Sequence, residues 1–456
     1  MEKSKNFPTP LSALLFNPTP LDFARGVALS LPKGNILLGF FIYGDIIYPT
    51  MIKFPAGFYW GAATSAYQVE GNNKNSDWWE WEKRAGKQPS GDACGHYRLY
   101  QEDFGLAKEL NHNAHRLSIE WARIEPQEGK FSEAEIGHYK QVIACLRQQN
   151  IEPVVTLHHF SNPLWFADSG GWKNPSAPDF FLRYVEKIVE ALSEKVHFWV
   201  TINEPMVYAY HAYILGAWPP QEKSSLEAKK VIHNLILAHV KAYRAIHAIY
   251  KRKNLKSPAV SIAKNIQAFA AAVPTLRNRV AAYLRHNSFN FAFLNSLMRH
   301  KALDFIGINY YTRGLVNVES WLIQALLFDE SKAKESGLQK NSLGWDIYPA
   351  GLYQLLLKFK KYRLPLFILE NGICTDDDNL RWEFICGHLA SLYLATQKGV
   401  RVLGYLYWSL LDNFEWDKGF SPRFGLIEVD YANFKRTIRE SARKFSQVCG
   451  TGLLKV

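Results

Sequence analysis

Cysteine is scarce in this chain of 456 residues. The five cysteines are an odd number without close pairs, so they indicate neither a disulfide framework nor a zinc site. A reducing cytoplasm is the simplest compartment for such a set, and we expect the protein there. The cysteines are Cys94, Cys145, Cys374, Cys386 and Cys449.

Two sequence patterns are missing altogether. No G-x-G-x-x-G or G-x-x-x-x-G-K-[ST] motif occurs, so nucleotide binding has no support, and an open doubly wound sheet would lack its phosphate loop. A spanning helix is missing from the first fifty residues, because their most apolar piece, residues 36–48, contains Asp45 and falls short of the about 20 residues that such a helix needs. We therefore expect no nucleotide cofactor and no membrane partner.

The charge is basic, with a formal net charge of +12 and a pI near 9.2. A basic balance can indicate a nucleic-acid or anionic-lipid partner. The basic residues are nevertheless spread along the chain, and the only tight run, residues 251–253, fits a solvated helix end. We predict no nucleic-acid role, and the sequence gives no signal for the oligomeric state.

The first fifty residues stand apart from the rest. They mix proline, asparagine and short apolar runs without periodicity, whereas organised patterns begin directly after Met51. We expect residues 1–50 to be a dispensable or poorly ordered extension and residues 51–456 to be one domain. An export or membrane-surface segment and a cap on the domain are the alternatives.

Eight short runs rich in β-branched and aromatic residues alternate with helical patterns from residue 58 onward. Eight βα repeats predict an α/β fold of the (β/α)8 TIM-barrel type, whose strands are apolar because both faces are buried. The predicted strands are Phe58–Thr64, Ala114–Trp121, Glu152–His159, His197–Glu204, Ala259–Ile266, Leu303–Tyr311, Leu366–Gly372 and Val402–Leu411.

Two glutamates, Glu204 and Glu370, stand at the ends of two of these runs, at the face where barrels build their active sites. A retaining glycosidase needs one proton-donating carboxyl and one nucleophilic carboxylate about 5–5.5 Å apart. Either glutamate alone has a plainer explanation, as a helix cap or a buried ion-pair partner. Their pairing at the same face is what predicts glycosidase chemistry.

Six motifs in order make the chain resemble glycoside hydrolase family 1, the β-glucosidase and β-glycosidase family, from about residue 54 to the C-terminus. The motifs read FPAGFYWGAATSAYQVEG (54–71), HRLSIEW (115–121), TINEP (201–205), NYY (309–311), LENG (369–372) and WSLLDNFEW (408–416). The resemblance implies a retaining exo-acting β-glycosidase, most simply a β-glucosidase, that acts on small β-glycosides or short oligosaccharides. It implies no cofactor and no metal.

The resemblance also implies a role for each matching residue. Glu204 matches the general acid/base, Glu370 the nucleophile and Arg116 the arginine beside the nucleophile. Tyr311 matches the tyrosine that hydrogen-bonds the nucleophile, and Asn203 the partner of the sugar 2-hydroxyl. The positions that match the sugar pocket and its entrance are Gln68, His159, Asn309, Trp345, Trp408, Glu415, Trp416 and Phe424.

Three alternatives stay open. A transglycosidase uses the same intermediate with another acceptor, and a non-catalytic sugar-binding barrel would be indicated by the loss of either glutamate. A 6-phospho-β-glycosidase is disfavoured because an ionised Glu415 would repel the phosphate. One departure from the family bears on activity: Leu369 stands where threonine is common, and we expect it to change the packing beneath Glu370.

Overall fold

The computed structural model describes residues 40–43, 46–49, 51–318 and 337–455. Most of the predicted extension, residues 1–39, 44–45 and 50, lies outside the described residues. Within its described part, β1 (Phe40–Tyr43) pairs antiparallel with β2 (Ile46–Pro49), a hairpin that the sequence analysis does not predict. Among the residues that the structure describes, no helix combines the length and apolar character needed to cross a membrane.

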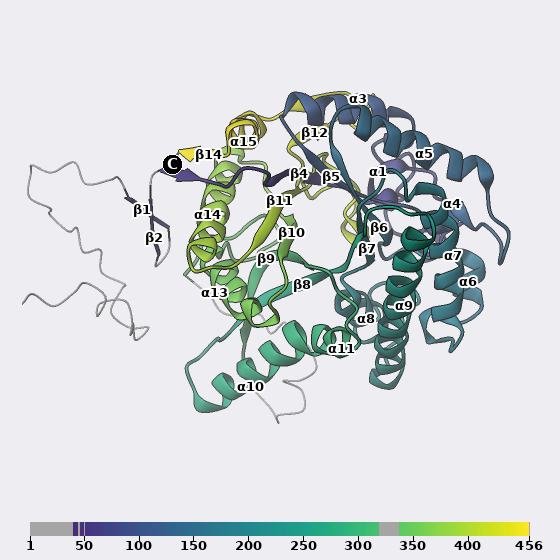
Figure 1. Cartoon of the computed structure of the whole chain (residues 1–456). Coiled ribbons are helices and arrows are strands. Elements are labelled where there is room, and N and C mark those ends of the chain that lie inside the picture. The colour runs from purple at the N-terminus through teal and green to yellow at the C-terminus, as the bar shows by residue number, and fades with distance from the viewer. Residues whose placement is uncertain (1–39, 44–45, 50, 319–336, 456) are drawn as a thin grey trace, which may run out of the picture. The chain divides into compact units, whose positions relative to one another are not determined.

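The predicted TIM barrel is confirmed. Eight parallel strands close into a barrel in the order β10-β11-β4-β5-β6-β7-β8-β9 (Figure 1). Every strand overlaps one predicted run. The strands are β4 (Tyr59–Ala63), β5 (Ala114–Ser118), β6 (Glu152–His158), β7 (Phe198–Asn203), β8 (Ala259–Ala271), β9 (Ile306–Val316), β10 (Leu366–Asn371) and β11 (Val402–Trp408).

Helices surround the barrel and cover the outer faces of its strands (Figure 1). The larger ones are α3 (His96–Glu109), α5 (Glu133–Gln148), α7 (Ala177–Leu192), α9 (Ser225–Arg252), α10 (Leu276–Asn287), α13 (Pro349–Phe359), α14 (Asp378–Gln397) and α15 (Glu440–Thr451). The shorter helices are α1 (Ala66–Glu70), α2 (Asp77–Arg84), α4 (Trp121–Ile124), α6 (Leu164–Asp168), α8 (Pro205–Tyr213) and α11 (Phe293–Arg299). Short strand pairs β14 (Leu453–Lys455) with β3 (Met51–Lys53), and β12 (Ile427–Val429) with β13 (Arg436–Ile438), lie outside the barrel sheet.

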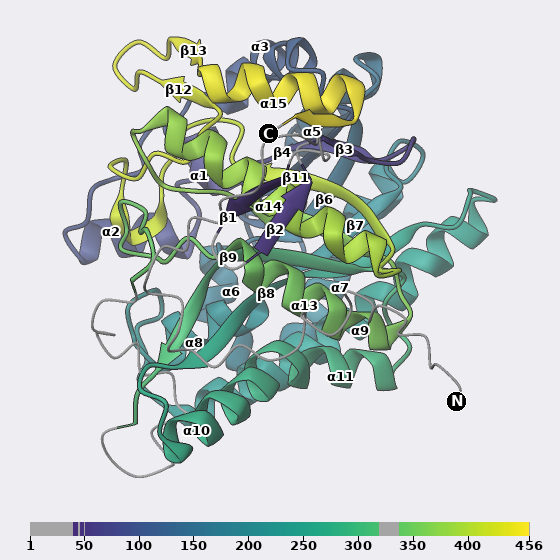
Figure 2. The same cartoon turned by 90° about the vertical axis from the view of Figure 1, so that its left-hand side faces the viewer.

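Two strands run further than predicted. β8 and β9 continue past the predicted ends, Ile266 and Tyr311, and residues 268–271 of β8 pair with residues 313–316 of β9. This two-stranded extension lies beside α10 (Figure 2). The error has a physical cause: residues 268–271 of β8 are mostly alanine, which is depleted in strands, so the sequence signal for a strand weakens while the backbone hydrogen bonds continue.

The barrel interior is filled by apolar side chains, so it is a packed core and not a pore. Leu369 belongs to this interior cluster, and its side chain occupies the space that the absent side chain of Gly307 leaves open. A Cβ at Gly307 would lie 2.4 Å from the Leu369 Cδ1. The expected change of packing beneath Glu370 is therefore a close Leu369–Gly307 contact within a filled core.

Candidate active site

Glu204 follows the last residue of β7 and directly precedes Pro205, the first residue of α8. Its backbone lies in the left-handed region (φ 41°, ψ 58°), a conformation that costs a residue other than glycine about 1–3 kcal/mol. The Glu204 N–H donates to the Ala263 carbonyl on β8 at 2.8 Å, which fixes this turn. The turn aims the buried Glu204 carboxyl at the carboxyl ends of the neighbouring strands.

Glu370, on β10, is buried and bound on both of its carboxyl oxygens. Arg116 on β5 donates to Oε1, and the Tyr311 hydroxyl on β9 donates to Oε2 at 2.5 Å. Burial raises the pKa of Glu370 above its ordinary value, while the Arg116 charge and these hydrogen bonds act in the opposite direction. The site thus provides direct stabilisation for an ionised Glu370.

Two amides connect the glutamates. The Asn309 Nδ2 donates to Glu204 Oε1 at 2.9 Å and to Asn203 Oδ1 at 3.1 Å. The same Asn203 oxygen accepts a 2.8 Å hydrogen bond from Arg116, the residue that binds Glu370. The strands β5, β7, β9 and β10 therefore hold both carboxyl groups in one hydrogen-bond network.

The surroundings of Glu204 favour its protonated form. Burial, followed by the nearby charge of Glu370, raises its pKa to about 7. Amide hydrogen bonds from Asn309 and Asn265 act in the opposite direction. Glu204 therefore differs from Glu370, because no arginine among the described residues pairs with it, and near neutral pH it can carry the proton that a general acid gives up.

Polar side chains from α1 and from the segment after β11 form one wall beside these glutamates. Gln68 on α1 donates to Glu415 Oε2 at 3.2 Å and to Asn413 Oδ1 at 3.0 Å. Burial, followed by the Glu370 charge, raises the pKa of Glu415 to about 8, so this carboxyl is mostly protonated at pH 7. Repulsion of a 6-phosphate by Glu415 therefore depends on the pH, and it is strongest where Glu415 is ionised.

His159 joins the same wall from the end of β6. Its Nε2 accepts from the Asn203 Nδ2 at 3.0 Å, which leaves the ring proton on Nδ1. Burial, with Arg116 nearby, holds the His159 pKa well below its usual range, so the ring is neutral. Among the residues that the structure describes, His159 Nδ1 and Asn309 Oδ1 have no hydrogen-bond partner. One donor and one acceptor are therefore available beside the carboxyl groups.

Aromatic rings line the rest of the site. Trp408, at the end of β11, stacks on His159 with ring centroids 6.0 Å apart, and Trp416 does so at the same distance. Trp408 and Phe424 pack in one small cluster against which Trp345 and Tyr311 lie. All thirteen site residues predicted from the sequence thus fall in one connected group at the carboxyl-end face of the barrel.

Sequence reasoning missed three residues of the site. Asn265 on β8 donates to Glu204 Oε1 at 3.1 Å, and its neighbour Lys264 is fully buried close to the same glutamate. Thr156 on β6 accepts from the Arg116 Nε at 2.9 Å and so fixes the guanidinium. The signal for the first two was present, because a lysine–asparagine pair interrupts an otherwise apolar predicted strand.

The described residues contain no group of three or more His, Cys, Asp or Glu side chains that could hold a metal ion. The adjacent histidines point to different partners, as the alternation of a strand requires. His158 lies against Asn162 and Trp172, whereas His159 bonds Asn203.

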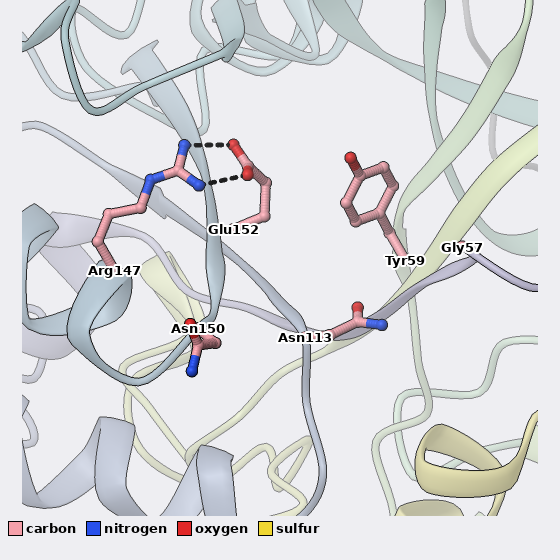
Figure 3. A pocket seen from close by; sticks show the side chains of 6 residues that line it. All are labelled: Gly57, Tyr59, Asn113, Arg147, Asn150 and Glu152. Carbon is pink, nitrogen blue, oxygen red and sulfur yellow. Dashed lines mark hydrogen bonds and ion pairs between the residues drawn. The ribbon is translucent and has the colours of Figure 1, made fainter.

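A separate cavity lies at the opposite end of the barrel (Figure 3). It is formed where strands begin: Tyr59 and Glu152 are the first residues of β4 and β6, and Asn113 directly precedes β5. Its charged groups, Arg147 and Glu152, bind one another (Figure 3). None of the predicted site residues contributes to this cavity.

Comparisons with known proteins agree with this arrangement. The family model described as Glycosyl hydrolase family 1 matches residues 50–300 and 294–452. The chain is 32% identical over 446 residues to a 1,4-beta-D-glucan glucohydrolase of Thermotoga neapolitana, covering 87% of this chain and 98% of that protein. It is 32% identical over 419 residues to a chloroplastic galactolipid galactosyltransferase of Arabidopsis thaliana, covering 84% of this chain and 64% of that protein.

Solved structures agree as well. The structure of a beta-glycosidase from Pyrococcus horikoshii matches with a TM-score of 0.83 and 40% sequence identity, covering 89% of this chain and 96% of that chain. The similarity therefore extends over most of both chains.

Proposed function

The chain belongs to glycosyl hydrolase family 1, and from its paired glutamates we propose that it is a retaining β-glucosidase. It removes terminal non-reducing β-D-glucosyl residues from small β-glycosides or short oligosaccharides. The observation that carries this proposal is the contrast between two buried carboxyl groups in one network. Glu370 has an arginine partner that stabilises its ionised form, whereas Glu204 has none within the part of the chain that the structure describes.

In the first step Glu370 acts as the nucleophile. One of its oxygens attacks the anomeric carbon of the sugar, and the bond between that carbon and the aglycone oxygen breaks. Glu204 gives its proton to the departing oxygen. Arg116 and Tyr311 hold the Glu370 carboxylate in place, which reduces the reorganisation needed for attack.

In the second step Glu204, now ionised, takes a proton from a water molecule. The water oxygen attacks the anomeric carbon and displaces Glu370, so the sugar leaves with its original β configuration. Loss of the covalent intermediate restores the Glu370 carboxylate and the Glu204 proton. The enzyme therefore needs no cofactor for either step.

The sugar is recognised by the polar wall and the rings. The unpartnered His159 Nδ1–H and Asn309 Oδ1 supply one donor and one acceptor for hydroxyls, and Asn203 supplies the partner of the 2-hydroxyl. Gln68 and Glu415 bind further hydroxyls. Trp416 also hydrogen-bonds a hydroxyl. Trp408 packs against the sugar ring, Phe424 closes the apolar side, and Trp345 lies toward the leaving group.

A panel of nitrophenyl β-glycosides tests this function. We expect turnover of the β-glucoside, with the galactoside, fucoside and mannoside ranked behind it, and little turnover of 6-phospho-β-glucoside. Faster turnover of the phosphorylated sugar would assign a 6-phospho-β-glycosidase instead. No turnover of any substrate by folded protein would contradict a hydrolase and favour a sugar-binding barrel.

Transglycosylation is the second candidate, and it is supported by the similarity to a protein named as a galactosyltransferase. Both reactions share the glycosyl-enzyme, and they differ in whether water or a sugar hydroxyl receives the glycosyl group. The ratio of released glucose to released nitrophenol distinguishes them. A ratio near one indicates hydrolysis, and a ratio that falls as acceptor sugar is added indicates transfer.

We also propose that residues 51–456 form the catalytic domain, in agreement with a family match that begins at residue 50. Retained activity after deletion of residues 1–50 tests this. A cytoplasmic location is supported by the five cysteines, each of which is free. Fractionation of the source cells tests the location.

A further inference from the structure

Lys264 is a buried lysine that the proposed mechanism does not use. It lies on β8 between Ala263, whose side chain packs in the barrel interior, and Asn265, whose side chain reaches Glu204. Alternation along a strand therefore directs the Lys264 side chain away from the interior, toward the helical layer. The whole residue is 0% exposed.

The contacts of the Lys264 ammonium are unusual for a buried charge. Its Nζ donates to the Asn265 carbonyl and lies over the Phe289 ring, 4.2 Å from the centroid. Within the described part of the chain no carboxylate lies within ion-pair distance of it. A buried ammonium without a paired carboxylate is costly, and an apolar side chain would pack at this position without that cost.

The electrostatic partner of Lys264 is Glu204. Burial lowers the pKa of Lys264 to about 7, and the Glu204 charge is what opposes that shift. In return, Lys264 is among the groups that oppose the upward shift of the Glu204 pKa. The two residues are also linked through Asn265. Lys264 donates to the Asn265 backbone carbonyl, and the Asn265 Nδ2 donates to Glu204 Oε1 at 3.1 Å.

We propose that Lys264 is a positioning residue for the acid/base glutamate. Its ammonium fixes the Asn265 backbone, and so the amide that binds Glu204, while its positive charge stabilises the ionised form of Glu204. That ionised form is required in the second step, when Glu204 takes the proton of water. This inference rests on the proposed function of Glu204 as the acid/base.

Other titratable groups face the two residues, and none of them replaces Lys264. Around Glu204 lie Glu370 on β10 and Glu415 after β11, both acids, and Tyr311 on β9. The neutral His159 on β6 reaches Glu204 only through Asn203 and Asn309, and Arg116 on β5 binds Glu370. On the helical side, Arg285 of α10 lies over Phe269, and His286 bonds Lys358 of α13 and Asn290.

The test is the pH profile of kcat/KM for the full-length enzyme with an aryl β-glucoside. The basic limb of this profile is the fall in kcat/KM on the alkaline side. In the variant Lys264→Met we expect this fall to occur at a pH higher by about 0.5–1 unit, because loss of the nearby cation makes Glu204 harder to ionise. Lys264→Gln removes the same charge while keeping a donor, and it carries the test where the methionine variant does not fold. The matched control is Lys358→Met, which removes another lysine with a lowered pKa that bonds His286 and not the site.

An unchanged basic limb in a folded Lys264→Met or Lys264→Gln enzyme overturns the inference, as does an equal shift in Lys358→Met. Failure of the proposed function gives a different result. In that case the wild-type enzyme does not hydrolyse the glucoside, or Glu204→Gln keeps the basic limb. A KM that stays near the wild-type value together with the shifted limb supports a positioning role.

Discussion

The two ends of the barrel each carry an arginine–glutamate pair, but the pairs are built differently. At the amino end Arg147 and Glu152 bind each other through two hydrogen bonds, with side chains 34% and 17% exposed. At the carboxyl end Arg116 and Glu370 are 0% and 5% exposed, and each is bound to further residues. Arg116 also holds Thr156 and Asn203, and Glu370 also accepts from Tyr311.

The difference shows that the ion pair itself does not create the function. Arg147 also donates to the Lys195 backbone carbonyl at 2.7 Å, but the residues that line the cavity beside the Arg147–Glu152 pair include no second carboxyl group. The Arg116–Glu370 pair leaves Glu370 held by single contacts on each oxygen, in a buried network with a second glutamate. Breaking the first pair should affect stability slightly, whereas breaking the second should stop the reaction.

The largest effect is expected for Glu370→Ala. Without a nucleophile the glycosyl-enzyme cannot form, so we expect kcat to fall by about 10⁴-fold or more, which is about 5.4 kcal/mol of activation free energy. Added azide should restore turnover of an aryl glucoside by entering the space left by the carboxylate. The recovered product should be the α-glucosyl azide, detected by NMR.

The configuration of the glucosyl azide is the control for this prediction. A β-glucosyl azide would mean that the anion entered from the other face, which would contradict Glu370 as the nucleophile. Thermal unfolding should be measured in parallel, since removal of Glu370 leaves the buried Arg116 without its charge partner. A folded but inactive variant separates the chemical effect from a loss of stability.

The second-largest loss of activity is expected for Glu204→Gln, and its size depends on the leaving group of the substrate. A glutamine cannot give a proton, so glucosides with poor leaving groups should lose about 10²–10⁴-fold in kcat/KM. Glucosides with very acidic leaving groups need no proton and should form the glycosyl-enzyme at a rate close to that of the wild type. The measurement is pre-steady-state release of the leaving group across a series of aryl glucosides.

Equal losses on all members of that series would remove Glu204 from the acid role. The pH profile provides a second measure. The pKa of Glu204 is raised to about 7, so the wild-type acid is present below that pH and lost as the pH rises through it. The Glu204→Gln variant should lack this basic limb.

The same comparison shows what the sequence predicts and what it does not. The barrel and its carboxyl-end site follow from strand periodicity and from motifs whose residues are consecutive, such as Asn203 with Glu204 and Glu370 with Asn371. Among the missed residues, Thr156 acts through a contact with Arg116 on a different strand, and no local pattern states which side chains meet. The protonation of Glu415 also depends on burial and on Glu370, which are properties of the folded site.

The smallest effect is expected for Glu152→Gln at the amino end. A partly exposed ion pair contributes about 0–1 kcal/mol, and glutamine keeps one acceptor for Arg147, so unfolding in urea should shift by less than about 1 kcal/mol. The value of kcat/KM should stay at the wild-type level, because this pair lies at the opposite end of the barrel from Glu204 and Glu370. A loss of activity above about tenfold without a loss of stability would show that the two ends are coupled through the packed interior. The pair at the amino end would then contribute to the active site, contrary to the separation that its partly exposed position at the opposite end of the barrel indicates.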